Sequence, residues 1–267
     1  MPSTGQIQDP RSFLGDRFDL PPLPAGDLPA AAPNLVPRSL KIVNSAYYDL
    51  ARPIGELRHA AAYLGADEMQ RIGLTVAVMD RLTPDDPDAF RDFWYHAFHT
   101  ALAARQIARR HMTTCDLEEL HIAASLHDIG KLVYMKFFPD AYRQLQVHAG
   151  QKGLSLCEAE ASLTMPSHAD MGTALCRRWK LPGSVLRACL KHELEDLSGG
   201  HLDDQQQLIC LANLLSGLST TEMTDVRKNE IREVALTTMG CSEAEFLLLM
   251  GELYEMHLKV QQLTDEL

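Results

Sequence analysis

Apolar residues recur at intervals of three and four along most of the chain. The pattern is clearest in two long stretches, 90–110 and 117–133, and in the second of these Ile122, Leu126 and Ile129 fall on one helical face. The alternation of apolar and polar residues that is typical of strands is almost absent. The pattern therefore predicts an all-α fold, with further helices at 38–45, 53–63, 158–163, 167–179, 182–193, 203–218, 221–238 and 242–265, and another that opens at residue 66.

Proline and glycine mark the predicted breaks and helix starts. Residues 1–38 are rich in proline, glycine, aspartate and alanine. Because proline removes a backbone donor and clashes inside a helix, we expect an extended arm or loop there. Pro53 suits the first turn of a helix, Pro139 is expected to interrupt one, and Ser167 is a start signal for the helix that follows it.

The composition is that of an ordinary globular chain with an acidic balance. The 267 residues carry a formal net charge of −11, and 46% of them are hydrophobic. An acidic surface disfavours non-specific binding to nucleic acid and to anionic membranes, so neither is expected as a partner. The N-terminal residues do not resemble a secretory signal, and the apolar clusters are shorter than a bilayer span.

The six cysteines indicate in which cellular compartment the protein is expected. No two of them are spaced as C-x-x-C, which argues against a zinc ribbon or a thioredoxin motif. Several lie inside apolar helical patterns, so we interpret them as small, reduced core residues. Reduced cysteines are typical of cytosolic proteins, and we expect a cytoplasmic location.

His127 and Asp128 stand side by side in an otherwise apolar stretch, AASLHDIGKLVYM. Both side chains are costly to bury without partners. Neighbouring residues on a helix point about 100° apart, but a long imidazole and a short carboxylate can still converge on one ion. Such a pair suits zinc, iron, manganese or nickel; Gly130 would leave room for a ligand, and Lys131 could bring charge to a phosphate oxygen. The alternative interpretation is a hydrogen-bonded structural pair.

Segments on both sides of this pair resemble the HDOD branch of the HD superfamily. SLHDIGKL resembles the superfamily signature, and FWYHAFHTALAAR at 93–105 resembles the helix that carries its first histidine. Further HDOD-like segments occur in the same order as in the family: LPPLP at 20–24, LKIVNSAYYDLARPIGELRHAAAYLG at 40–65, HADMGTALCRRWKLP at 168–182 and CLKHEL at 189–194. The resemblance implies an HD-superfamily helical bundle with a short N-terminal helical subdomain.

The same resemblance implies a division of the chain. We expect an N-terminal arm at 1–19, an HDOD domain at 20–218 and C-terminal helices at 219–267 that pack on the core. Within the domain, 20–88 would be the N-terminal helical part and 89–218 the HD-type core.

Metal ligands are also implied by the resemblance, residue by residue. One or two divalent transition metal ions, iron, manganese, zinc or nickel, would be held by His96, His127, Asp128, His168 and His192. His168 and His192 match the positions that hold a second ion in two-metal relatives such as the HD-GYP phosphodiesterases, where Lys131 has a counterpart that helps to hold the phosphate.

Alternatives remain open for several of these residues. His99 lies one turn from His96 and could replace it, although Trp94, two residues before His96, favours His96. His168 could instead cap a helix. His192 could be a polar residue at a helix end, and Lys131 could be a solvated lysine or a partner of Asp128.

The sequence departs from the enzymes of the superfamily at the closing ligand. Asn213 stands where those enzymes have an aspartate, and a neutral amide can ligate a metal without adding charge, or hydrogen-bond a His or Asp. No G-Y-P element follows His192. Both departures speak against hydrolysis of cyclic di-GMP.

Two functions are therefore expected in order of preference. The first is a bacterial signal-transduction module with a degenerate metal site, which acts through a signalling protein partner or a bound ligand. The alternative is a metal-dependent phosphohydrolase that acts on a nucleotide or phosphate ester, with Asp128 and Lys131 as catalytic residues.

The last helix offers a third feature, a strong amphipathic stripe from Phe246 to Leu258. The stripe could pack on its own domain, or it could form a homodimer or partner surface.

Overall fold

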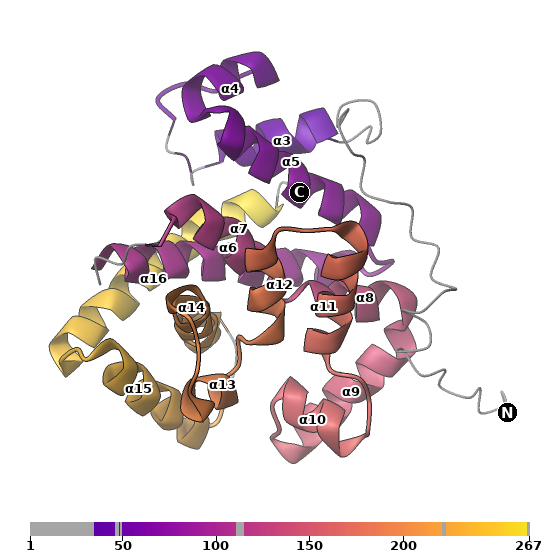
Figure 1. Cartoon of the computed structure of the whole chain (residues 1–267), viewed down its shortest axis with the longest axis vertical. Coiled ribbons are helices and arrows are strands. Elements are labelled where there is room, and N and C mark those ends of the chain that lie inside the picture. The colour runs from indigo at the N-terminus through magenta and orange to yellow at the C-terminus, as the bar shows by residue number, and fades with distance from the viewer. Residues whose placement is uncertain (1–34, 46–47, 49, 111–114, 221–222, 266–267) are drawn as a thin grey trace, which may run out of the picture.

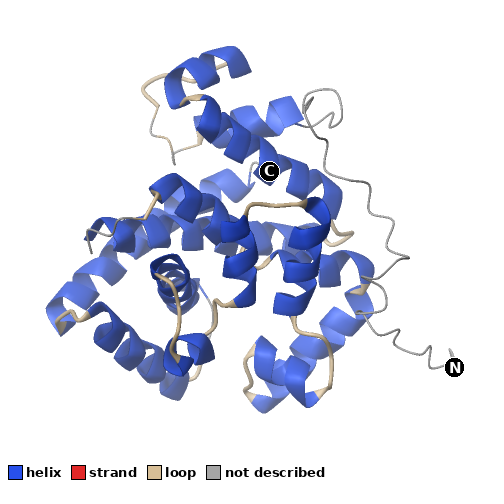
Figure 2. Ribbon diagram, in the orientation of Figure 1, coloured by secondary structure: helices blue, strands red, loops and turns tan. Residues whose placement is uncertain are grey.

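The computed structural model describes residues 35–45, 48, 50–110, 115–220 and 223–265, and in these residues it contains helices and no strand (Figure 2). The all-α prediction is confirmed. The arm expected at 1–19 lies outside the described residues, as does most of the proline-rich segment up to residue 38.

Three helices gather at one end of the molecule (Figure 1) and form its N-terminal helical part: α3 (Leu35–Asn44), α4 (Leu57–Leu64) and α5 (Ala66–Leu82). The predicted helix start at Pro53 is wrong, because α4 begins only at Leu57. The Asn44 side chain explains the difference. Its amide donates to the Ile54 carbonyl at 2.8 Å and its oxygen accepts from the Ile54 N–H at 2.6 Å, which holds this segment as a loop.

The middle of the chain forms the helices α6 (Pro87–Arg110), α7 (Leu117–Leu126), α8 (Ile129–Phe137), α9 (Pro139–Lys152), α10 (Leu156–Ser162), α11 (His168–Trp179), α12 (Gly183–Leu190), α13 (Leu194–Gly199) and α14 (Asp204–Thr220). The single helix predicted at 117–133 is wrong in one respect. The chain breaks between α7 and α8 at the His127–Asp128 pair, where Asp128 has φ −99° and ψ 12°. This break lets the two neighbouring side chains turn towards the same point.

Two other helices differ from the prediction. The helical run breaks at Pro139 as expected, but Pro139 also begins α9, a helix that was not predicted, because its missing N–H costs nothing in a first turn. The helix after Pro182 ends at Leu190, short of the predicted Glu193, so His192 and Glu193 lie in the link to α13. The start signal at Ser167 is confirmed, since its hydroxyl accepts from the Asp170 N–H at 3.0 Å.

Two apolar clusters build the core, and α6 contributes to both. The first unites the N-terminal helical part with the first half of α6 and with α8, α11 and α12, and it includes the fully buried Trp94. The second unites the later part of α6 with α7, α14, α15 (Asp225–Met239) and α16 (Glu243–Asp265). The end of α16 returns to the first cluster through Val260 and Leu263.

Among the described residues, no single helix is long and apolar enough to cross a membrane. The pair α15 and α16, bent by 110°, passes that test only when the two are taken together, by length and composition alone.

Gly130 brings α8 against α11. A Cβ at this position would lie 1.9 Å from the His168 carbonyl oxygen and 2.7 Å from the Gly172 nitrogen. The space that the sequence suggested for a ligand is therefore taken by the backbone of α11. Glycine is needed here because it lets the helix that carries His168 approach the His127–Asp128 break.

Candidate metal centre

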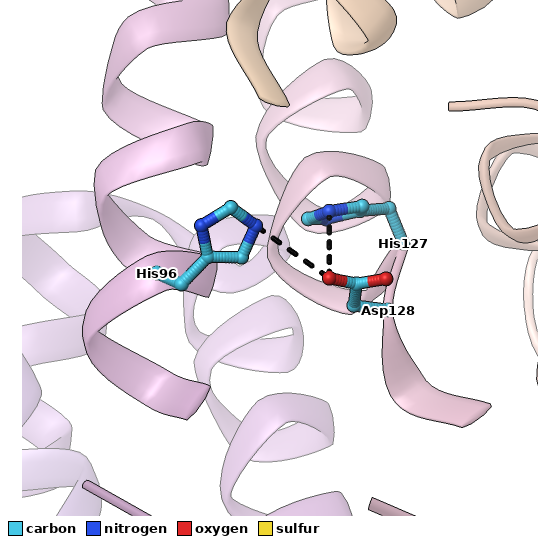
Figure 3. A group of neighbouring side chains, drawn as sticks. All are labelled: His96, His127 and Asp128. Carbon is cyan, nitrogen blue, oxygen red and sulfur yellow. Dashed lines mark ion pairs between the residues drawn. The ribbon is translucent and has the colours of Figure 1, made fainter. Parts of the chain in front are cut away.

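Asp128 lies at the centre of a histidine cluster. Its Oδ2 atom is 3.5 Å from His96 Nε2 and 3.3 Å from His127 Nε2, as the dashed lines in Figure 3 show. Its Oδ1 atom is 3.5 Å from His168 Nε2 and 3.2 Å from His192 Nε2. The five residues come from α6, from the α7–α8 break, from the first turn of α11 and from the link after α12, so the tertiary fold assembles them.

Most of this cluster is buried. His127, Asp128, His168 and His192 are each 1% exposed. The side chains at its rim are His96, with 23% exposure, and Lys131 and Glu193, with 20% each. Access from solvent is therefore confined to the side where these three residues lie.

Hydrogen bonds fix the orientation of two imidazoles. His127 Nδ1 lies 2.6 Å from the Ala124 carbonyl oxygen, and His192 Nδ1 lies 3.0 Å from the Ala188 carbonyl oxygen. A carbonyl oxygen can only accept, so each Nδ1 must carry the proton. In the neutral imidazoles, the Nε2 lone pairs then face the Asp128 carboxylate.

Glu160 orients His168 in the same way, through the Nδ1 atom of the imidazole, and Glu160 is itself 1% exposed. His168 Nδ1 lies 3.0 and 3.1 Å from the two Glu160 oxygens, and the His168 backbone N–H donates to the same carboxylate at 3.0 Å. Carboxylates in this position commonly orient metal-binding histidines. His168 Nε2 then lies 3.0 Å from His192 Nε2, and two nitrogens at this distance need a proton or a cation between them.

The electrostatics of the cluster combine burial with opposite charges. Burial by itself raises the pKa of Asp128, but the Lys131 ammonium and the neighbouring His127 hold it well below the usual range. Burial also lowers the pKa of His96 to about 3, so this imidazole is neutral at physiological pH. For His168, hydrogen bonds to Glu160 and Glu193 outweigh burial and raise the pKa to about 9.

Lys131 is a partner of Asp128. Its Nζ atom lies 2.6 Å from Asp128 Oδ2. This contact agrees with the alternative interpretation of Lys131 as a partner of Asp128. The ammonium group is therefore engaged by the carboxylate and lies at the rim of the cluster.

The structure separates the two candidate histidines of α6. His96 faces Asp128, whereas His99 is fully buried elsewhere. His99 Nδ1 lies 2.9 Å from the Ser216 hydroxyl oxygen and its Nε2 lies 3.0 Å from the Leu253 carbonyl. Only His96 is thus placed to join the cluster.

Asn213 does not point its amide at Asp128. Its Nδ2 atom donates to the His192 backbone carbonyl at 2.9 Å. The residue at the position of the closing aspartate therefore supports the link that carries His192 and supplies no charge to the cluster.

Glu193 brings the charge that Asn213 lacks. Its Oε1 atom is 3.4 Å from His168 Nε2 and 3.5 Å from His192 Nε2. Burial by itself raises the pKa of Glu193, but the hydrogen bond to His168, the nearby His192 imidazole and the Lys131 ammonium hold it well below its usual range. A second carboxylate therefore faces the histidines from the rim.

The residues fit a divalent transition metal. Within the described part of the chain, the buried atoms His96 Nε2, His127 Nε2 and Asp128 Oδ1 have no hydrogen-bond partner. The ligand atoms of His96, His127 and Asp128 lie within 4.8 Å of one another, as do those of Asp128, His168 and His192. Imidazole nitrogens with carboxylate oxygens are the donors that zinc, iron, manganese and nickel accept.

Sequence reasoning missed the two glutamates. Glu193 directly follows His192, but no spacing in the sequence marks it as a partner of His168. Glu160 lies eight residues before His168, and this separation in sequence matches no motif. The Glu160 carboxylate contacts the His168 imidazole because α10 and α11 approach each other closely.

Comparison with known sequences matches the HDOD domain family to residues 30–194 of this chain. A sequence relative, an uncharacterized protein from Treponema pallidum, is 23% identical over 158 residues, which are 59% of this chain and 31% of that protein. This chain thus spans less than a third of that relative's length.

Solved structures share the fold. An HDOD domain protein of unknown function from Geobacter sulfurreducens superposes with a TM-score of 0.70 at 23% identity, over 95% of this chain and 88% of that one. A protein from Marinobacter aquaeolei, provisionally named a signal transduction protein, gives a TM-score of 0.69 at 18% identity, over 97% and 61% of the two chains. A provisionally named phosphohydrolase from Shewanella amazonensis gives 0.67 at 20% identity, over 88% and 82%.

Proposed function

Because the chain belongs to the HDOD domain family, we propose that it is a regulatory signal-transduction module, which acts through a protein partner or a bound ligand. Its histidine cluster holds a divalent transition metal as part of the domain's structure. The burial of the cluster carries this proposal. Four of the central residues are 1% exposed, and solvent reaches the cluster only from the side of His96, Lys131 and Glu193. A hydrolytic metal needs an open position that substrate and water can reach.

Asp128 would hold the metal together with His96, His127, His168 and His192, and Glu193 would supply the second carboxylate. A bound divalent cation would act as a Lewis acid. The chain's own residues fix the geometry: Ala124 and Ala188 carbonyls and the Glu160 carboxylate set the histidine orientations. Lys131 neutralises Asp128 from the rim.

The experiment that tests this proposal measures metal content and turnover together. Plasma mass spectrometry of the purified protein is expected to find iron, manganese, zinc or nickel, and Asp128→Ala is expected to lose it. With the metal bound, hydrolysis of bis(4-nitrophenyl) phosphate should not exceed that of the free metal ion. Turnover above that level which disappears in Asp128→Ala would overturn the regulatory proposal.

One observation favours the alternative, a metal-dependent phosphohydrolase. The two oxygens of Asp128 face separate histidine pairs, His96 with His127 and His168 with His192. A carboxylate between two such pairs suits two cations. Lys131 would have to release Asp128 before its ammonium could meet a phosphate.

A further inference from the structure

A cavity of about 510 Å³ lies between the N-terminal helical part and the HD-type core. Its walls are the end of α4, the start of α5, the later part of α6, the start of α7 and Met256 of α16, and Figure 1 shows how these helices are arranged. None of the residues of the candidate metal centre lines it. On α6, His96 and Arg105 are separated by about 14 Å along the helix axis.

Three arginines face this cavity from two helices. Arg105 and Arg109 lie one turn apart on α6, and Arg71 faces them from α5. Arg109 is exposed, and no ion pair joins it to another described residue. Guanidinium groups with this spacing offer paired donors to a phosphate or carboxylate group.

Three carboxylates also line the cavity, Asp67, Glu68 and Glu118, and Asp67 is exposed to solvent. Glu68 forms an ion pair with Arg71, with 2.9 Å between Glu68 Oε2 and Arg71 Nε, and accepts a hydrogen bond from the Tyr48 hydroxyl. Glu118 contacts Arg71 and Arg105 at 3.6 and 3.4 Å, which are long distances for charge-assisted hydrogen bonds. Burial and the neighbouring Glu68 raise the pKa of Glu118.

The start of α5 adds backbone donors to the same wall. Gly65, Ala66 and Asp67 line the cavity, and Gly65 at the N-cap position offers no side chain to the first N–H groups of this helix. The N-terminus of a long helix favours negative charge. Gly65 has φ +90°, a conformation that other residues rarely adopt.

An apolar surface completes the cavity. Leu64, Leu102 and Met256 line it beside the charged groups. A volume of this size is usual for sites that bind small organic molecules.

We propose that this cavity binds a small organic anion, whose phosphate or carboxylate group lies on Arg71, Arg105 and Arg109 and whose apolar part packs on Leu64, Leu102 and Met256. Such a ligand contacts the N-terminal helical part and the core at once. Its binding therefore fixes the position of α5 relative to α6 and α7. The inference concerns a site other than the histidine cluster and needs neither a metal nor a hydrolytic activity.

Isothermal titration with three probes tests the proposal. Phenyl phosphate and benzoate carry the same ring and differ in the anionic group, and benzamide is the neutral control. At least one of the two anions is expected to bind, and benzamide is expected not to. The one that binds more tightly identifies the phosphate or the carboxylate as the preferred group.

Variants locate the binding. Arg109→Ala should weaken binding about tenfold, since a charge-assisted hydrogen bond is lost, and the double variant Arg105→Ala/Arg109→Ala should abolish it. Arg110→Ala is the matched control, because it removes the next charge on α6, which pairs with Glu252 outside the cavity. It should change the affinity less than twofold, and Asp128→Ala should leave it unchanged.

Three results would overturn the proposal. One is that neither anion binds the wild-type protein. Another is that the double variant binds as the wild type does. The last is that Asp128→Ala abolishes binding, which would place the probe at the histidine cluster. The first two results leave the regulatory function proposed above untouched, whereas the third would favour its phosphohydrolase alternative.

Discussion

At the scale of single residues, the cluster depends on two carboxylates that face the same histidines. Asp128 reaches all four of them and Glu193 reaches His168 and His192. Asn213, at the position where the superfamily enzymes have the closing aspartate, is turned to a backbone carbonyl. The charge balance of the site is therefore set by a residue that the family pattern does not mark.

Glu193→Gln is expected to weaken zinc binding by at least about tenfold, because it removes one anionic ligand and leaves the histidines in place. Competition with a chromogenic chelator measures the affinity. Asn213→Asp is the informative comparison. An aspartate there would face the His192 carbonyl, so it should lower the stability and should not raise the affinity. If Asn213→Asp binds zinc more tightly and Glu193→Gln binds it as the wild type does, the role given to Glu193 is wrong.

Glu68 gives a pH dependence that can be worked out. Burial by itself raises its pKa, but hydrogen bonds with Glu118, Tyr48 and Arg71 outweigh this and lower it from 4.5 to about 2. A carboxyl group with a lowered folded-state pKa stabilises the fold above its unfolded pKa, and that contribution is lost as the pH falls through the folded value.

Glu68→Gln is therefore expected to lower the free energy of unfolding at pH 7, with a deficit that shrinks between pH 4.5 and about pH 2. Urea titrations at several pH values measure it. Glu255→Gln, at an exposed position of α16, is the control and should show little difference at any pH. A deficit for Glu68→Gln that stays constant down to pH 2 would contradict the linkage.

At the scale of helices, the contact between α8 and α11 positions the site. Gly130 lies in the first turn of α8, and its lack of a side chain lets the His168 backbone come within contact distance. The His127–Asp128 pair directly precedes this turn, so the same contact joins both halves of the cluster.

Gly130→Ala is expected to cost more than about 2 kcal/mol of stability, because its methyl group would force the two backbones apart. It should also weaken metal binding, since His168 would move with α11. Gly150→Ala on α9 is the matched control: a Cβ there meets nothing within 4 Å, and alanine favours a helix. Chemical unfolding of both variants checks the prediction, and equal stabilities would refute it.

At the scale of the whole molecule, α16 has two apolar sides. Phe246, Leu249 and Leu253 are buried in the second core cluster, as the first interpretation of its stripe expected. Tyr254 and Leu258 remain 69% and 70% exposed. The homodimer expected from the sequence stays a prediction, and these exposed side chains are where it would form.

The molar mass of the protein in solution tests this prediction. If α16 forms a homodimer, light scattering should give twice the monomer mass, and Leu258→Glu should return the protein to a monomer, since a charge would be buried in the interface. Val226→Glu, at another exposed apolar position on α15, is the control and should not change the mass. A monomer mass for the wild-type protein at high concentration would contradict the homodimer prediction.

The sequence by itself determined the helical fold and the family, and it predicted a set of histidines that the structure brings together around Asp128. These follow from local signals: the three-and-four spacing of apolar residues, the serine before α11, and short motifs in a fixed order. The break at His127–Asp128 and the start of α4 were not predicted, because the first falls inside an unbroken apolar pattern and the second depends on the Asn44 contact with Ile54.

Only the tertiary structure decided which polar residues meet. Glu160 and Glu193 reach His168 because α10, α11 and the link after α12 converge, and Asn213 is turned away by a hydrogen bond to the backbone. The cavity lined by Arg71, Arg105 and Arg109 likewise forms where α5 faces α6 and α7. Contacts between residues distant in the sequence depend on how helices pack, and a periodic pattern defines the buried face of each helix but not its neighbour.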